Sequence, residues 1–303
     1  MVNKITITKN IAEATAITHG GIFHADEVMG TVILQKCIGN ITLCRTFKVP
    51  EELKEGVIVY DIGFGRYDHH QKGGNGARES GVPFAACGLI WKAFGQKIAA
   101  DTCNPELVWN LIDRDLIQGI DAIDNGVMPK ADYPAQAMTL SSVISGFNPN
   151  WDSNEEPDVA FAKAVEFAEV VFDNVLESAI SKAKAQQIVE EAIEKAKEHI
   201  MVLEQFVPWQ EGIFSSTNHK ACEIQFVVFP SNRGGYNWQC VPDGLGSFRQ
   251  RKTVPEEWKG LHDDDLQRVT GIETATFCHP AGFIGGAKTF ADAFALAEMA
   301  VQA

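Results

Sequence analysis

The sequence lacks any long apolar run. No stretch reaches the roughly 18 consecutive apolar residues of a transmembrane helix. Its N-terminal segment, MVNKITITKNIAEATAITHGG, has neither the apolar centre of a secretion signal nor the arginine-rich character of an organelle transit peptide. We therefore expect a cytoplasmic protein with no membrane partner.

Paired cysteines and excess positive charge are also missing. The seven cysteines are scattered, odd in number and form no C-x-x-C pair, which excludes a thiolate metal motif and suits a reducing compartment. The 26 basic residues against 40 acidic ones give a net charge of −14, which argues against a protein that coats nucleic acid. An enzyme that binds phosphates at one site remains compatible, because bound cations would offset the acids there.

The remaining composition is that of a globular protein, with 303 residues, enough for one large or two ordinary domains. Apolar strand patterns alternate with helical ones through the first half. We predict strands over 14–18, 41–47 and 57–62, and helices over 25–37, 83–95 and 104–126. This alternation indicates an α/β domain with a largely parallel sheet.

A helical stretch from 158 to about 206 is too long for one ordinary capped helix, so we expect two helices or one bent connector. The predicted strands over 223–231, 236–242 and 273–279 and a closing helix then form a smaller α/β or α+β domain. We expect a domain at 1–205, connector included, and another at 206–303.

Imidazole and carboxylate residues collect where the predicted strands of the first domain end. They are His19, His24, Asp26, Asp61, Asp68, His69, His70, and the pair Asp121 and Asp124 on the next long helix. Each has an ordinary explanation alone: a helix cap, a strand end or a solvated helix face. Four separate elements would direct these groups into one crevice beyond the strand ends. Bringing so many carboxylates and imidazoles together costs free energy unless cations lie there.

Three imidazoles and several carboxylates supply ligands for two divalent ions, with one carboxylate shared. Ligation by nitrogen and oxygen without thiolate suits manganese or magnesium first, then iron or zinc. Two such ions clamp the attacking and leaving oxygens of a phosphoryl displacement. The ligand types therefore predict a metal-dependent hydrolase of a phosphoester or phosphoanhydride.

Four segments resemble the motifs of the DHH phosphoesterase superfamily: THGGIFHADE, VYDIG, YDHHQKG and IDAIDNG. The sequence is most similar to its Myg (melanocyte-proliferating-gene) exonuclease branch, through NWQCVPDGLGSFRQRKTVPEEWKGL and TGIETATFCHPAGFIGGAKT. The resemblance covers nearly the whole chain and implies a DHH-type parallel-sheet domain and a 3′–5′ exonuclease that degrades RNA or short oligonucleotides.

The resemblance also implies roles for individual residues. One metal would be held by His19, His24 and Asp61, and the other by Asp26, Asp61, His69 and Asp121. Asp68 would orient an imidazole, and His70 would contact the phosphate or the leaving oxygen in an electrophilic or acid role. Most superfamily members have an acid at the position of His24, so this chain departs from the pattern there. The sequence does not decide between Asp121 and Asp124; we favour Asp121 because it leads the DAIDNG motif.

In the second domain, GFIGGAKT resembles a glycine-rich phosphate-binding motif, with Gly285, Gly286 and Lys288. A basic and aromatic segment contributes Arg233, Arg249 and Arg251, a combination that grips single-stranded nucleic acid. Core aromatics and solvated arginines explain that segment about as well, and glycine pairs often serve turns.

Two alternatives stay open. One is hydrolysis of a small phosphate compound such as pyrophosphate or a cyclic dinucleotide. The other, in a different class, is a metal-stabilised binding protein without turnover. The oligomeric state, a homo-oligomer included, is not determined by the sequence.

Overall fold

The computed structural model describes residues 5–127 and 137–303. Its contacts divide the chain into two compact units, Met1–Ser181 and Lys182–Ala303. The division falls inside one long helix, whereas the sequence placed the domain boundary near residue 205. Within the described ranges, no helix is both long and apolar enough to cross a bilayer.

The first unit contains a four-stranded sheet in the order β1-β3-β2-β4, with every neighbouring pair parallel. The strands are β1 (Ile5–Thr8), β2 (Ala16–His19), β3 (Ile41–Thr46) and β4 (Ile58–Val59). The predicted α/β unit with a parallel sheet is confirmed. Strand β4 is shorter than the predicted 57–62, because Asp61 has a positive φ of 56° and leaves the strand conformation.

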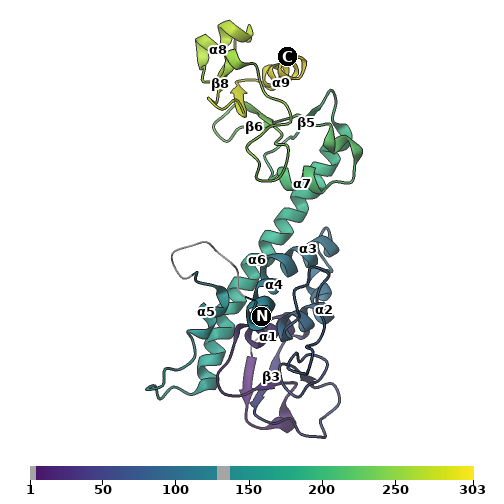
Figure 1. Ribbon diagram of the computed structural model, residues 1–303, viewed down its shortest axis with the longest axis vertical. Coiled ribbons are helices and arrows are strands. Elements are labelled where there is room, and N and C mark those ends of the chain that lie inside the picture. Colours follow the sequence, from purple (N-terminus) through teal and green to yellow (C-terminus); the bar gives the residue numbers. More distant parts are fainter. Residues whose placement is uncertain (1–4, 128–136) are drawn as a thin grey trace. The chain divides into compact units, whose positions relative to one another are not determined.

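Helices surround this sheet and are coloured purple to teal in Figure 1. They are α1 (Ala25–Ile38), α2 (Ala86–Ala99), α3 (Pro105–Ile112), α4 (Gln118–Asp124), α5 (Leu140–Ser145) and the start of α6 (Pro157–Lys195), with short helical turns η1 (Ile11–Glu13) and η2 (Asp113–Ile117). Helix α1 is buried from Ala25 to Gln35. Gly30 permits its close packing on α2, since a Cβ there would lie 2.8 Å from Ile90 Cδ1.

Two predicted helices differ from the structure in ways that follow from packing. Helix α2 continues past Gly95 to Ala99, and packing rather than helix termination explains this glycine, since a Cβ there would lie 2.5 Å from the ring of Trp91. The predicted helix 104–126 is divided by the π-helical segment η2. Such π turns are frequent at functional sites.

The helical connector is a single helix of 39 residues, α6. No glycine or proline interrupts 158–195, so nothing in the sequence stops it. Its N-terminal part buries Phe161 and Phe172 in the first unit. Its last turns bury Val189 and Ile193 in a core cluster of the second unit.

The second unit has a five-stranded mixed sheet in the order β5-β6-β7-β9-β8, with only β5 and β6 parallel. Its strands are β5 (Ile200–Val202), β6 (Phe226–Pro230), β7 (Tyr236–Cys240), β8 (Ala275–Cys278) and β9 (Ile284–Ala287). Its helices are α7 (Gln210–Ser215), α8 (Asp263–Thr270), α9 (Phe290–Gln302), η3 (His219–Cys222) and η4 (Glu256–Trp258). The predicted smaller mixed domain is confirmed.

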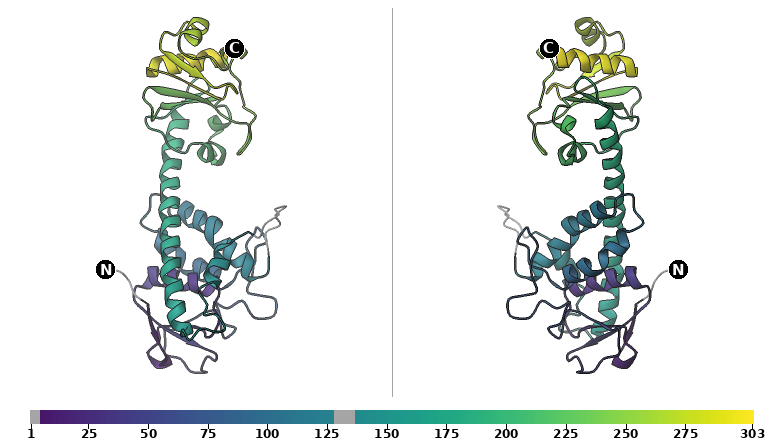
Figure 2. Two further views of the ribbon diagram at one scale, coloured as in Figure 1. Left: turned by 90° about the vertical axis from the view of Figure 1, so that its left-hand side faces the viewer. Right: turned by 90° about the vertical axis from the view of Figure 1, so that its right-hand side faces the viewer.

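The two faces of this sheet are covered differently. Helix α9, yellow in Figure 2, lies along one face over a core centred on Trp238. On the other face, α7 and the end of α6 pack on Val227 and Phe229 of β6. Farther along that second face, Asn237 and Gln239 of β7 line a pocket.

Candidate metal centre

Two neighbouring parallel strands bring the predicted ligands together. Strand β2 ends in His19, and the chain then turns into α1, which begins after His24. Strand β4 pairs with β2 and leads to Asp61. The carboxyl ends of parallel strands meet at one sheet edge, where open α/β sheets bind ligands.

Asp61 lies at the middle of the cluster. Its Oδ2 is 3.3 Å from His19 Nε2, while its Oδ1 is 3.6 Å from His69 Nδ1 and 3.5 Å from His70 Nδ1. Its left-handed backbone, with φ 56°, is unusual for a residue other than glycine and is typical of functional sites. This conformation turns the carboxylate toward imidazoles from two different loops.

Asp26 and Glu27 add two fully buried carboxylates from the first turn of α1. Glu27 accepts a hydrogen bond from the backbone N–H of His24 and lies 2.9 Å from His19 Nε2. Asp26 Oδ2 is 4.0 Å from His69 Nδ1. Glu27 was not predicted from the sequence. Its position three residues after the helix-capping residue His24 could have indicated it. The same spacing is found in ordinary helix caps, so it does not by itself indicate a functional residue.

Several buried atoms of this cluster have no hydrogen-bond partner among the described residues. They are both carboxylate oxygens of Asp26, Oδ1 of Asp61 and Nδ1 of His69. Unpaired buried polar atoms are rare and costly, so they call for an explanation. Buried carboxylate oxygens and imidazole nitrogens that face one another without hydrogen-bond partners suit a divalent cation, and the residues present therefore fit the predicted metal group.

The pKa values of the cluster also indicate that no positive charge compensates its buried carboxylates. Burial raises the pKa of Asp26 well above its ordinary value, and the Asp61 carboxylate raises it further. Burial likewise raises the pKa of Asp61. Although burial lowers the pKa of His19, hydrogen bonds to Asp61 and Glu27 raise it to about 10. The metal-free cluster thus retains protons where a cation would neutralise it.

Asp124, rather than Asp121, extends to the imidazoles. Asp124 Oδ2 is 2.9 Å from His69 Nε2, and the oxygen and nitrogen atoms of His24, Asp26 and Asp124 lie within 4.8 Å of one another. The sequence favoured Asp121, but its carboxylate accepts hydrogen bonds from Arg78 and from the backbone N–H of Gly88. Gly88 leaves the room for this contact, since a Cβ there would meet Asp121 Oδ2 at 1.9 Å.

Asp68 and His70 form a separate pair at the edge of the cluster. Asp68 Oδ1 accepts hydrogen bonds from the His70 backbone N–H and from His70 Nδ1, at 3.0 and 2.7 Å. Asp68 Oδ2 accepts one from the Phe64 backbone N–H. Although burial raises the pKa of Asp68, these hydrogen bonds lower it on balance. The His70 side chain is 53% exposed, so its other nitrogen is free to meet a ligand.

A pocket of about 480 Å³ opens beside the cluster. It is lined by His24, His69, His70, Asp124 and Ser141, with further residues of α4 and α5. No Lys or Arg of the described part of the chain lines it. A substrate group in this pocket would contact the imidazoles directly.

The substrate-binding residues predicted in the second unit are dispersed. Arg249 pairs with Asp243, and Arg251 donates to the backbone carbonyls of Ala221 and Ile224. Only Arg233 is exposed at a pocket and has no ion pair within the described ranges.

The glycine-rich motif is a strand instead of a phosphate-binding loop. Because β9 lies between β7 and β8, the backbones of Gly285 and Gly286 belong to the sheet ladder. Gly285 lies against the Trp238 ring, and Lys288 is exposed just after the strand. Hydrogen-bonded strand amides are not available to cradle a phosphate.

Comparisons with known proteins agree with the resemblance. Residues 15–301 match the profile of the MYG1 exonuclease family, described as an uncharacterised protein family (UPF0160). The chain is 31% identical to a MYG1 protein of Saccharomyces cerevisiae over 94% of both chains. It is 30% identical to the MYG1 exonucleases of Mus musculus and Homo sapiens, over 90% and 93% of this chain and 80% and 84% of theirs. No solved structure gives a significant match.

Proposed function

This chain belongs to the MYG1 exonuclease family, and on that premise we propose that it is a metal-dependent phosphodiesterase that removes nucleotides from the 3′ end of RNA or short oligonucleotides. The observation that carries the proposal is the group of buried, unpartnered ligand atoms on Asp26, Asp61 and His69. The relatives named exonucleases in mouse and human support the choice of a nucleic acid substrate.

We assign two divalent ions to the cluster, with Asp61 shared between them. His19 and His24 would hold one ion, and Asp26 and His69 the other, with Asp124 in place of Asp121, the carboxylate favoured from the sequence. His19 Nδ1 lies 3.1 Å from the carbonyl oxygen of Gly20, which would accept its proton, fix the ring and leave Nε2, near Asp61 and Glu27, to hold the ion. When bound, the ions would supply Lewis-acid stabilisation of the phosphoryl oxygens and lower the pKa of a nucleophilic water.

The chain's own residues would position the substrate and move the proton. His70 lines the pocket and is held through Nδ1 by Asp68, which leaves Nε2 to protonate the leaving oxygen. The Ser141 hydroxyl, which also lines the pocket, can donate to a phosphate or sugar oxygen. Burial of the carboxylates excludes water from the side of the cluster away from the pocket.

Pyrophosphate fits this site less well. A compact substrate with several negative charges needs cationic side chains around it, and none of the described residues that line the pocket is Lys or Arg. A phosphodiester carries one charge, which the cluster with its ions would balance. The geometry within this unit therefore favours a phosphodiester.

The test is hydrolysis of single-stranded RNA labelled at the 5′ end, with added Mn²⁺ and with EDTA-treated protein. A ladder that shortens from the unlabelled 3′ end, with release of nucleoside monophosphates, is the expected result. Products that begin at the labelled end would overturn the polarity. Mn²⁺ binding without cleavage of RNA or of bis(p-nitrophenyl) phosphate would identify a metal-stabilised binding protein.

A further inference from the structure

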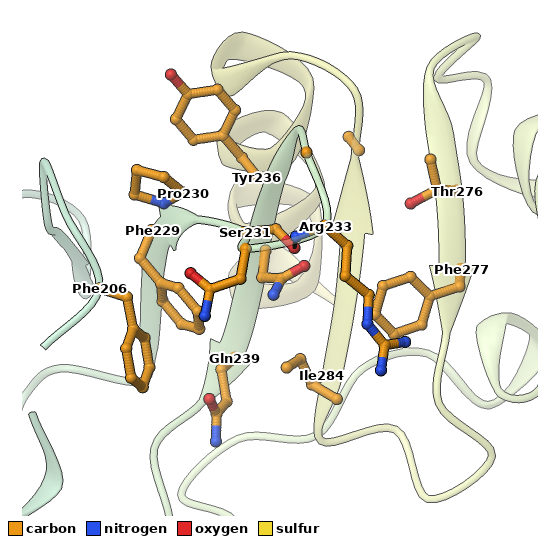
Figure 3. Close-up of a pocket in the computed structure, with 14 residues that line it drawn as sticks. Phe206, Phe229, Pro230, Ser231, Arg233, Tyr236, Gln239, Thr276, Phe277 and Ile284 are labelled. Carbon is orange, nitrogen blue, oxygen red and sulfur yellow. Dashed lines mark hydrogen bonds between the residues drawn. The ribbon is translucent and has the colours of Figure 1, made fainter. Parts of the chain in front are cut away.

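The open part of the second unit's sheet holds a pocket of about 550 Å³. Three of its lining residues stand in one row across the sheet: Phe229 of β6, Asn237 of β7 and, beyond the buried Gly286 of β9, Phe277 of β8. In Figure 3, Phe206 and Phe229 lie on one side of the pocket and Thr276 and Phe277 on the other, with Gln239 between them. Aromatic rings thus flank a polar centre.

Gly286, which is buried, lets three of the lining side chains stand close together. A Cβ at that position would lie 3.0 Å from Phe277 Cε1 and 3.1 Å from both Asn237 Oδ1 and Thr276 Oγ1. The Phe277 ring and the polar groups of Asn237 and Thr276 therefore close over the glycine and form one continuous surface of an aromatic ring beside an amide and a hydroxyl.

Three polar side chains that line the pocket have no hydrogen-bond partner among the described residues. The side-chain amides of Asn237 and Gln239 and the hydroxyl of Thr276 make no hydrogen bond to any part of the chain that the structure describes. An amide offers both donors and an acceptor, which is what the edge of a nucleobase requires. Arg233, exposed at the rim, adds one positive charge without a partner in the described ranges.

We propose that this pocket is a nucleobase subsite for single-stranded nucleic acid. A base would stack on Phe277 and bond to the Asn237 amide, while Arg233 contacts the adjoining phosphate. Stacking on aromatic side chains of an open sheet together with hydrogen bonds to base edges is how proteins hold unpaired strands. The neutral centre and single rim cation suit bases, whereas a phosphate cluster would need several cations. The subsite rests on the proposed function, because it serves that nuclease's substrate.

The experiment compares two substrates of the full-length protein with Mn²⁺. One is a single-stranded RNA of roughly ten nucleotides, long enough to occupy a base-binding sheet. The other is bis(p-nitrophenyl) phosphate, which contains no base. For Phe277→Ala we expect the KM for RNA to rise about tenfold with little change in kcat. Hydrolysis of the small phosphodiester should be unchanged, and Phe277→Trp should restore the RNA KM.

Asn237→Ala tests the amide separately. It should raise the RNA KM and should not change hydrolysis of the small phosphodiester. Trp151→Ala is the matched control, since that side chain is 96% exposed and lies in the other unit. Thermal melting of each variant verifies its fold.

Three outcomes would overturn the subsite. An unchanged RNA KM in folded Phe277→Ala is one, and an equal loss on both substrates is another. A change in oligomeric mass without a change in RNA KM would assign the face to a second copy of the chain. If the wild-type protein cleaves neither substrate, the proposed function fails; if it cleaves RNA and the variants are normal, only the subsite fails.

Discussion

The edge of the first sheet and the open face of the second differ in how they use polar side chains. At the first, carboxylates and imidazoles from the end of β2, the first turn of α1 and the loop after β4 lie together, with several buried atoms unpaired among the described residues. At the second, neutral amides and phenyl rings stand in register across neighbouring strands. Concentrated charge suits cations and chemistry at phosphorus, whereas a neutral, flat surface suits the recognition of bases.

This comparison also separates two kinds of kinetic effect. Groups that act on the transition state change kcat, and groups that hold remote parts of the substrate change mainly KM when they bind ground state and transition state equally. Substitutions at the sheet edge should therefore lower kcat on every phosphodiester. Substitutions on the open sheet face should raise KM only for substrates with bases.

Asp61→Asn should have the largest effect. Loss of the shared carboxylate should lower kcat by about a thousandfold or more, since the metal's charge stabilisation is worth several kcal/mol. Asparagine tolerates the left-handed backbone of this position, so the fold should persist. The variant should also lose the rise in melting temperature that Mn²⁺ gives the wild type. The exposed Asp101→Asn is the control, and a full Mn²⁺ response in Asp61→Asn would contradict the shared-ligand assignment.

His70→Ala should come next, with kcat lowered about a hundredfold and Mn²⁺ binding retained, because general acid catalysis contributes on this order. Asp68→Asn should lower kcat by roughly tenfold, since it only orients that imidazole. A substrate with a p-nitrophenolate leaving group needs little protonation and should be much less affected. Equal losses on RNA and on that substrate would exclude the acid role of His70.

Asp124→Asn and Asp121→Asn test which carboxylate serves the metal. Asp124→Asn should weaken Mn²⁺ binding by about ten- to a hundredfold, as measured by isothermal titration calorimetry. Asp121→Asn should leave Mn²⁺ affinity intact and lower the free energy of unfolding by about 1–3 kcal/mol, because Arg78 loses a buried charged partner. The reverse pattern would restore the assignment that the sequence favoured.

The last test is the pH dependence of metal affinity. In the metal-free protein the pKa of His19 is raised to about 10. Its stabilising contribution is complete below its ordinary value near 6.5 and is lost as pH rises through 10. The raised pKa values of Asp26 and Asp61 act in the same direction. Mn²⁺ must displace the His19 proton, so its affinity should rise about tenfold per pH unit between pH 7 and 9. A flat profile in calorimetry would contradict a ligand role for His19.

Much of the sheet edge was predictable because its signals are local. Alternating strand and helix patterns indicate a parallel sheet, and the polar residues directly follow strand ends in the sequence. His19, Asp61 and His69 therefore needed no long-range information to be selected. Glu27 was missed because an ordinary capping role is enough to account for a glutamate at that helix position.

The second sheet was less predictable. The motif GFIGGAKT indicated a glycine-rich loop, yet its glycines lie in β9 between two strands. In the sequence, nothing distinguished the three arginines of the basic segment as candidates for substrate binding. The fold directs Arg251 to backbone carbonyls and Arg249 to Asp243, which leaves Arg233 at a pocket. Which arginine can still bind a substrate phosphate depends on the carboxylates and carbonyls that the fold places beside each one.

The amino-acid sequence alone determined which residue types would meet at the strand ends, because spacing along the chain fixes where each strand delivers its next side chain. Tertiary structure decided which of them are free to act. Arg78, 43 residues before Asp121, forms an ion pair with that carboxylate, and it is Asp124 that lies beside His69. The pairing of β7, β9 and β8 likewise places Asn237, Gly286 and Phe277 in one row, since strand register is a property of the assembled sheet.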